Sequence, residues 1–131
     1  MATWQEIKSY IHSNYKVQED AGELLTLVFS VDGGRGRSQL IHVLSFIEEG
    51  NPLSHVVMFS PIGEMAQIDA GRALKEASQY TFGVGLVGDL LGIKHTQLSA
   101  TIDPSEIDVP FDIITEIADA LEKALVGGDR F

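Results

Sequence analysis

Residues 24–63 read LLTLVFSVDGGRGRSQLIHVLSFIEEGNPLSHVVMFSPIG, and they predict three consecutive β-strands separated by two short turns. Apolar side chains recur there with a period of two, which sends neighbouring side chains to opposite faces of a sheet. The glycines supply the positive φ angles that such turns need. Consecutive strands with short turns form an antiparallel meander. We expect Pro61, which has no backbone N–H, to end the third strand or to lie at its edge.

Helical periodicity is found both before and after this meander. The N-terminal segment predicts a helix over residues 3–14, with Thr3 as its cap and Glu6 completing a capping box, and the following KVQEDAG breaks the pattern. A second helix is expected over residues 64–79, where Ala66, Ala70, Ala73, Leu74 and Ala77 would form a face of small side chains.

The clearest helical pattern is DVPFDIITEIADALEKALVGG, residues 108–128. Asp108 is its candidate cap, Pro110 falls in its first turn and Gly127 is its expected stop. A second apolar stripe through Ile113 and Ile117 widens the apolar arc, so part of this helix is expected to contact something other than its own sheet.

Two more strands are predicted between the second and third helices, in YTFGVGLVG and TQLSATID. The order is then α-β-β-β-α-β-β-α. This order predicts an α+β fold, with a five-stranded antiparallel sheet and helices packed on it, in a single domain spanning residues 1–131.

Charge and composition exclude several classes of partner. Nine Lys and Arg against nineteen Asp and Glu give a net charge of −10, which repels nucleic acid and anionic membrane surfaces. The chain has no cysteine, so no disulfide framework or cysteine-ligated metal is possible. With no signal-peptide pattern and no apolar run long enough to span a membrane, we expect a cytoplasmic protein.

TFGVGLVGDLLG, residues 81–92, contains Gly83, Gly85 and Gly88 in the G-x-G-x-x-G spacing of a dinucleotide fingerprint. That fingerprint needs a strand before the first glycine and a helix beginning at the third. The pattern here has a helix before Gly83 and no helix after Gly88, so we expect no cofactor. Instead, Gly83 and Gly85 would leave one strand face bare, so that the second helix or a partner segment could approach closely.

The sequence gives little support for anion binding, metal binding or catalysis. The Gly33–Arg37 turn is a candidate anion site through Arg35 and Arg37, with a plain hairpin turn as the alternative. The four histidines come from separate segments without metal-ligand spacing, and no serine lies in a nucleophile elbow, so we expect neither a metal site nor catalysis. The acids Asp112, Glu116, Asp119 and Glu122 of the last helix are interpreted as a solvated face.

Several segments resemble the YbjN family and, more broadly, the type III secretion chaperone-like fold. They are TWQEIKSYI near the N-terminus, GGRGRSQLIHV, VVMFSPIG and the closing EIADALEKALVGGDRF. The resemblance implies a small acidic protein, a homodimer, whose sheet and helices bind a segment of another polypeptide without catalysing a reaction.

The sequence also indicates which surface would bind such a partner. One layer of helices can cover only one face of the sheet, and the opposite face would still carry apolar groups that need a cover. A second copy about a two-fold axis, or an extended peptide from another protein, would supply it. The candidate partner or dimer residues are Leu24, Val28, Leu40, His42, Gly83, Gly85, Ile113 and Ile117. The alternative is a small-anion or nucleotide-binding regulatory domain that uses the Gly33–Arg37 turn or the Gly83–Gly88 strand.

Overall fold

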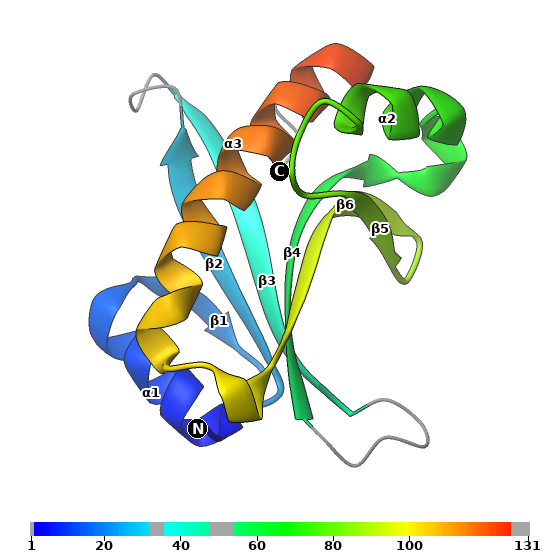
Figure 1. The fold of residues 1–131 in the computed structure, drawn as a ribbon. Coiled ribbons are helices and arrows are strands. Elements are labelled where there is room, and N and C mark those ends of the chain that lie inside the picture. Colours follow the sequence, from blue (N-terminus) through cyan, green and yellow to red (C-terminus); the bar gives the residue numbers. More distant parts are fainter. Residues whose placement is uncertain (1, 32–35, 48–53, 127–131) are drawn as a thin grey trace.

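A computed structural model describes residues 2–31, 36–47 and 54–126 of the chain. It is an α+β fold built on an antiparallel sheet, as the sequence predicts (Figure 1). In chain order the helices and strands are α1 (Trp4–Asn14), β1 (Val17–Asp20), β2 (Leu24–Val31), β3 (Arg37–Ile47), β4 (Ser54–Glu64), α2 (Ala70–Ala77), β5 (Val84–Val87), β6 (Leu90–Leu98) and α3 (Asp108–Leu125).

The sheet has six strands in the order β1-β2-β3-β4-β6-β5, so the prediction of five was wrong. The missed strand is β1, within the segment predicted to break the pattern. Its sequence VQED offers a single apolar residue, and three of its four side chains are exposed, so no alternation marks it. It is a strand because its backbone pairs with β2, through Glu19 opposite Thr26 and Asp20 opposite Leu25.

The first and last helices lie where the sequence predicts them. Thr3 caps α1 by accepting a hydrogen bond from the backbone N–H of Glu6 at 3.2 Å. Asp108, however, is not the cap of α3: that position belongs to Ile107, which makes no side-chain cap bond. The Asp108 carboxylate instead accepts hydrogen bonds from the hydroxyls of Tyr10, at 2.7 Å, and Tyr15, which tie α1 to α3. The expected stop, Gly127, lies outside the described residues.

The second helix is half as long as predicted. α2 begins after Asp69, whose side chain accepts a bond from the backbone N–H of Arg72 at 3.1 Å. The preceding residues complete β4 and form a short 3-10 turn, Met65–Gln67. Ala73 and Ala77 are buried, but Leu74 is exposed, so the expected small-residue face is buried only in part.

The C-terminal pair of strands is shifted relative to the prediction. β6 is LLGIKHTQL, and the expected strand in TQLSATID is only its end, because residues Ser99–Thr101 form a 3-10 turn. β5 and β6 are joined through Gly88, which adopts a φ of 59°. Gly92, at a buried position of β6, interrupts the period-two pattern of side chains in the sequence.

β3 and β4 form a fork. They pair only over residues 42–47 and 54–59, and beyond this stretch β3 pairs with β2 alone and β4 with β6 alone. Pro61 lies beyond the last β3 pair, so β4 does not end there but runs on to Glu64 with a shift in register after Pro61. Gln39 bridges the fork, donating from its side-chain amide to the Pro61 carbonyl at 2.8 Å.

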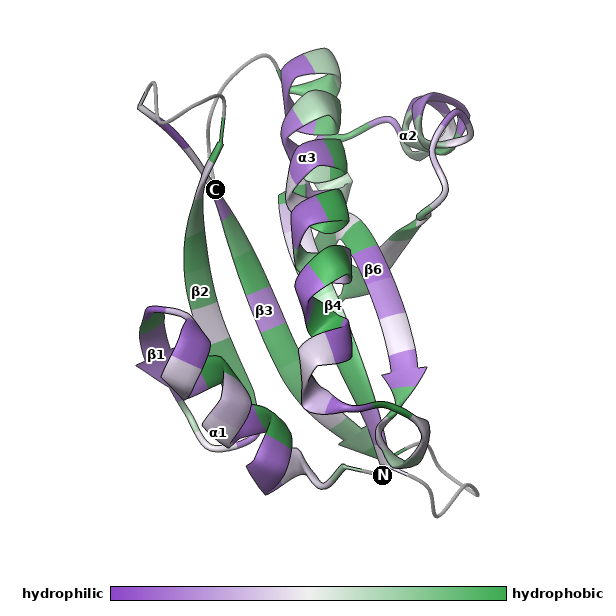
Figure 2. Cartoon of the chain, turned by 60° about the vertical axis from the view of Figure 1, so that its left-hand side comes forward, coloured by the Kyte–Doolittle hydropathy of each residue, from purple (hydrophilic) through white to green (hydrophobic). Residues whose placement is uncertain are grey.

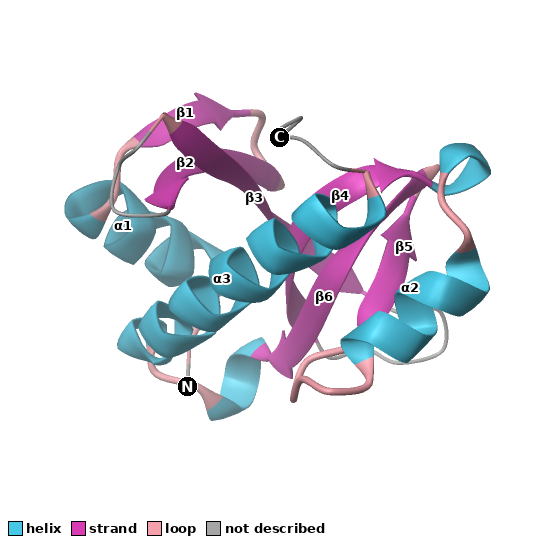
Figure 3. Ribbon diagram, turned by 90° about the horizontal axis from the view of Figure 1, so that it is seen from above, coloured by secondary structure: helices cyan, strands magenta, loops and turns pink. Residues whose placement is uncertain are grey.

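The helices pack on one face of the sheet, which we call the covered face (Figures 1 and 3). α3 lies across β2, β3, β4 and β6, with its hydrophobic and hydrophilic residues on different sides (Figure 2). Tyr15, Phe29 and Phe111 meet there with ring centroids 5.2–5.7 Å apart. Around them lie fully buried aliphatic side chains, among them Ile7, Ile11, Leu25, Ile41, Val43, Met58, Ile93 and Ile114.

Candidate functional site: the open face of the sheet

No described helix packs on the opposite side of the sheet, which we call the open face (Figures 1 and 3). Side chains paired across an antiparallel ladder share a face, so the register identifies its members. The pairs are Leu24 with Leu44, Thr26 with His42, Val28 with Leu40, Phe46 with His55, Val57 with Thr96 and Phe59 with Lys94.

The open face is apolar where β3 and β4 pair. Leu44 and Phe46 of β3, Val57 of β4 and Val87 of β5 border a shallow hollow of about 470 Å³. Phe46 is 51% exposed, whereas Val57 forms the buried floor. Exposed apolar groups gathered in one hollow are typical of surfaces that bind an apolar partner.

Lys94 lies at the rim of this hollow. A Cβ on Gly85 would lie 3.0–3.1 Å from carbon atoms of the Lys94 side chain, so the missing side chain of Gly85 leaves room for the lysine stem. The ammonium group donates to the Leu86 carbonyl at 3.1 Å. Among the described residues, none of the ion pairs includes Lys94.

Two histidines of the open face differ in their partners. His42 contacts the Thr26 hydroxyl at 3.1 Å, and burial lowers its pKa while the nearby charge of Glu19 opposes this effect. His55 lines the hollow, and its Nδ1 is buried without a hydrogen-bond partner among the described residues. A Thr–His contact is one element of nucleophilic catalysis, but the Thr26 side chain is buried and so is not presented to a substrate.

The predicted partner residues do not form one surface. Leu24, Val28, Leu40 and His42 share the open face, with Val28 42% exposed. Ile113 and Ile117 belong to α3 on the other side of the sheet, where Ile117 is buried and Ile113 packs against the core. The sequence set missed Leu44, Phe46, Val57 and Lys94, although the alternation of β3 through Leu40 and His42 continues to Leu44 and Phe46.

Gly83 and Gly85 do not receive α2. A Cβ on Gly83 would have no atom within 4 Å, and the neighbour of Gly85 is Lys94 of the adjacent strand. The close backbone approach is at Gly92, where a Cβ would lie 2.2 Å from the Ser60 carbonyl oxygen. Since Gly88 leads into strand β6, the helix that a dinucleotide fingerprint requires is missing after the third glycine.

The acids of α3 are not all solvated. Asp119 and Glu122 are buried beside Arg37, whose Nε donates to Asp119 Oδ1 at 3.0 Å and whose Nη2 lies 3.7 Å from Glu122 Oε1. The interpretation as a solvated face was therefore wrong for these two, because β3 places a cation against the helix. Arg37 of the candidate anion turn is therefore bonded to the acids of α3. Arg35 and Gly33 of that turn lie outside the described residues.

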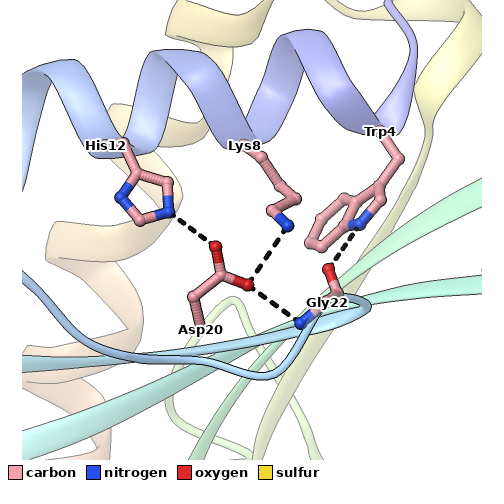
Figure 4. Close-up of polar contacts among 5 residues, drawn as sticks. All are labelled: Trp4, Lys8, His12, Asp20 and Gly22. Atoms are coloured by element: carbon pink, nitrogen blue, oxygen red, sulfur yellow. Dashed lines mark hydrogen bonds and ion pairs between the residues drawn. The ribbon is translucent and has the colours of Figure 1, made fainter.

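A second polar cluster joins α1 to the strand that the sequence did not reveal (Figure 4). Asp20 of β1 accepts from Lys8 at 3.1 Å, from His12 at 2.9 Å and from the backbone N–H of Gly22 at 2.9 Å. These bonds, the Gly22 bond first, lower the Asp20 pKa to about 2. Trp4 donates to the Gly22 carbonyl at 3.0 Å, so the cluster fixes α1 over β1.

The described part of the chain holds no group of three or more His, Asp or Glu side chains able to bind a metal ion. Within residues 2–31, 36–47 and 54–126, none of the helices is both long and apolar enough to cross a membrane. No family model, no curated protein and no solved structure matches this chain. The resemblance to the YbjN family therefore stays a prediction.

Proposed function

We propose that the chain is a non-enzymatic, dimeric protein-binding module of chaperone-like type, and that the open face is its binding surface. The observation that carries this proposal is the apolar hollow beneath Phe46, on the side of the sheet that the described helices leave uncovered. Fully burying a leucine or phenylalanine side chain is worth about 1.5–3 kcal/mol, so covering Leu44 and Phe46 together stabilises an association.

The chemistry of the open face supports binding rather than turnover. Its ionisable groups are spread over separate strands, and the hydroxyl beside His42 is buried. A surface of apolar centre and polar rim is the arrangement of protein interfaces. The described contacts do not favour the alternative function, an anion or nucleotide site. Arg37 is bound to Asp119, and Gly83 to Gly88 belong to a β-hairpin.

The test is the mass of the protein in solution, measured by sedimentation velocity over a range of concentrations. The variant Phe46→Asp places a charge in the hollow and is expected to convert the dimer into a monomer. Val109→Asp is the matched control, because Val109 is 64% exposed on the first turn of α3, where an acid suits the helix N-terminus.

Three outcomes would contradict the proposal: a wild-type protein that stays monomeric at every concentration, a Phe46→Asp variant that dimerises like the wild type, or equal effects of the two substitutions. Circular dichroism of each variant checks that its fold is intact, since neither position belongs to the buried core.

A further inference from the structure

Glu19 and Lys94 occupy the two ends of one row of side chains across the open face. The register joins the row strand by strand: Glu19, Thr26, His42, Phe59 and Lys94. It spans β1 to β6, four strand spacings or about 19 Å. His42 of β3 stands at its midpoint, and Leu44 and Phe46 continue along the same strand into the hollow.

The two end residues carry opposite charges that the described residues leave without an ion-pair partner. Among the described residues, Lys94 bonds only to a backbone carbonyl, and Glu19 takes part in none of the ion pairs. Both side chains are exposed. The acid and the base are therefore exposed on opposite sides of His42, while Thr26 and Phe59 between them are buried.

We propose that the open face binds a second copy of this chain about a two-fold axis parallel to β3, with Lys94 of each copy paired to Glu19 of the other. This inference rests on the function proposed above and adds its orientation. A two-fold rotation about an axis over His42 reverses the row, so each lysine arrives opposite a glutamate. Leu44 and Phe46 lie along the axis and meet their own counterparts.

A second copy explains the charges better than an unrelated protein does. A different partner would need a base and an acid at the same separation and in the reverse order, whereas a second copy supplies both by symmetry. The pairing also works against the repulsion of two chains that each carry a net charge of −10. Charges at the rim of an apolar interface select its orientation in this way.

The first experiment is a charge swap measured by sedimentation velocity at low ionic strength. Lys94→Glu and Glu19→Lys are each expected to raise the dimer dissociation constant about tenfold, because each change makes two like-charge contacts per dimer. The double variant restores both pairs and is expected within about twofold of the wild type. Lys75→Glu on α2 and Glu116→Lys on α3, both exposed, make the same charge changes elsewhere and should leave association unchanged.

The second experiment uses the absence of cysteine from the chain. A Glu19→Cys/Lys94→Cys variant is expected to form cross-linked dimers with a short bis-maleimide, while each single variant is not, because the axis separates identical positions by about 19 Å.

A double swap as weak as either single change, or single variants that cross-link as well as the double one, would overturn the Lys94–Glu19 pairing. If Phe46→Asp nevertheless abolishes association, the open face is the interface and only this orientation fails. If Phe46→Asp leaves association unchanged, the proposed function fails with it.

Discussion

On the covered face of β3, Ile41 and Val43 are fully buried, whereas on the open face of the same strand Phe46 remains half exposed. The strand is apolar on both sides, so composition does not separate its faces. The difference lies in the helices, because α1 and α3 close one face and no described helix closes the other (Figures 1 and 3). The apolar residues of β3 therefore have two different roles: those on the covered face form the core of the chain, and those on the open face form the surface that we propose for a partner.

The largest expected effect contrasts one phenylalanine from each face. Phe111→Ala removes the centre of the cluster with Tyr15 and Phe29 and should lower the free energy of unfolding by about 4 kcal/mol. Phe46→Ala removes a ring that the monomer leaves half exposed and should cost the monomer about 1 kcal/mol. Urea denaturation at low protein concentration measures both, and equal losses would contradict the difference between the faces.

A smaller loss of stability is expected at Gly92, where the backbones of β6 and β4 approach each other closely. Gly92→Ala would place a Cβ 2.2 Å from the Ser60 carbonyl oxygen and 2.8 Å from the Pro61 Cα, so the backbone must move. We expect a loss of about 3 kcal/mol in the free energy of unfolding. Gly83→Ala is the control, since its Cβ would have no atom within 4 Å; a similar loss in both variants would disprove the close approach.

The smallest effect concerns the attachment of α1, which covers one end of the covered face. The pKa of Asp20 falls from 3.8 to about 2 on folding, so its carboxylate stabilises the folded state above pH 3.8 and loses this effect as the pH falls toward about 2. Asp20→Asn should be less stable than the wild type at pH 6, and the gap should close by pH 2. Thermal unfolding across this range measures the gap, and a gap that does not depend on pH would contradict the role of the charge.

Alternation and helix periodicity were sufficient to predict β2, β3, α1 and α3. They were not sufficient for β1, because VQED has no apolar pattern and becomes a strand only by pairing with β2. They also misplaced Asp108, whose partners Tyr10 and Tyr15 lie more than ninety residues away in sequence. Interactions between distant segments decide these positions, and a local pattern does not contain them.

The candidate site, too, was predicted only in part from the sequence. The sequence predicts a second apolar face and names four of its residues, Leu24, Val28, Leu40 and His42. It could not say that Ile117 belongs to the covered side, since a helix stripe looks the same against its own sheet as against a partner. Asp119 and Glu122 appear solvated in the pattern of α3 because their cation comes from β3.

The fork between β3 and β4 affects how the chain folds while it is being synthesised. α3 contacts strands on both arms of the fork, yet it follows all of the described strands in the sequence. During synthesis, the two arms leave the ribosome before the helix that holds them together has been translated. Until α3 docks, the covered face of each arm exposes its apolar side chains, so the nascent chain passes through a stage that is open to aggregation or to binding by a chaperone.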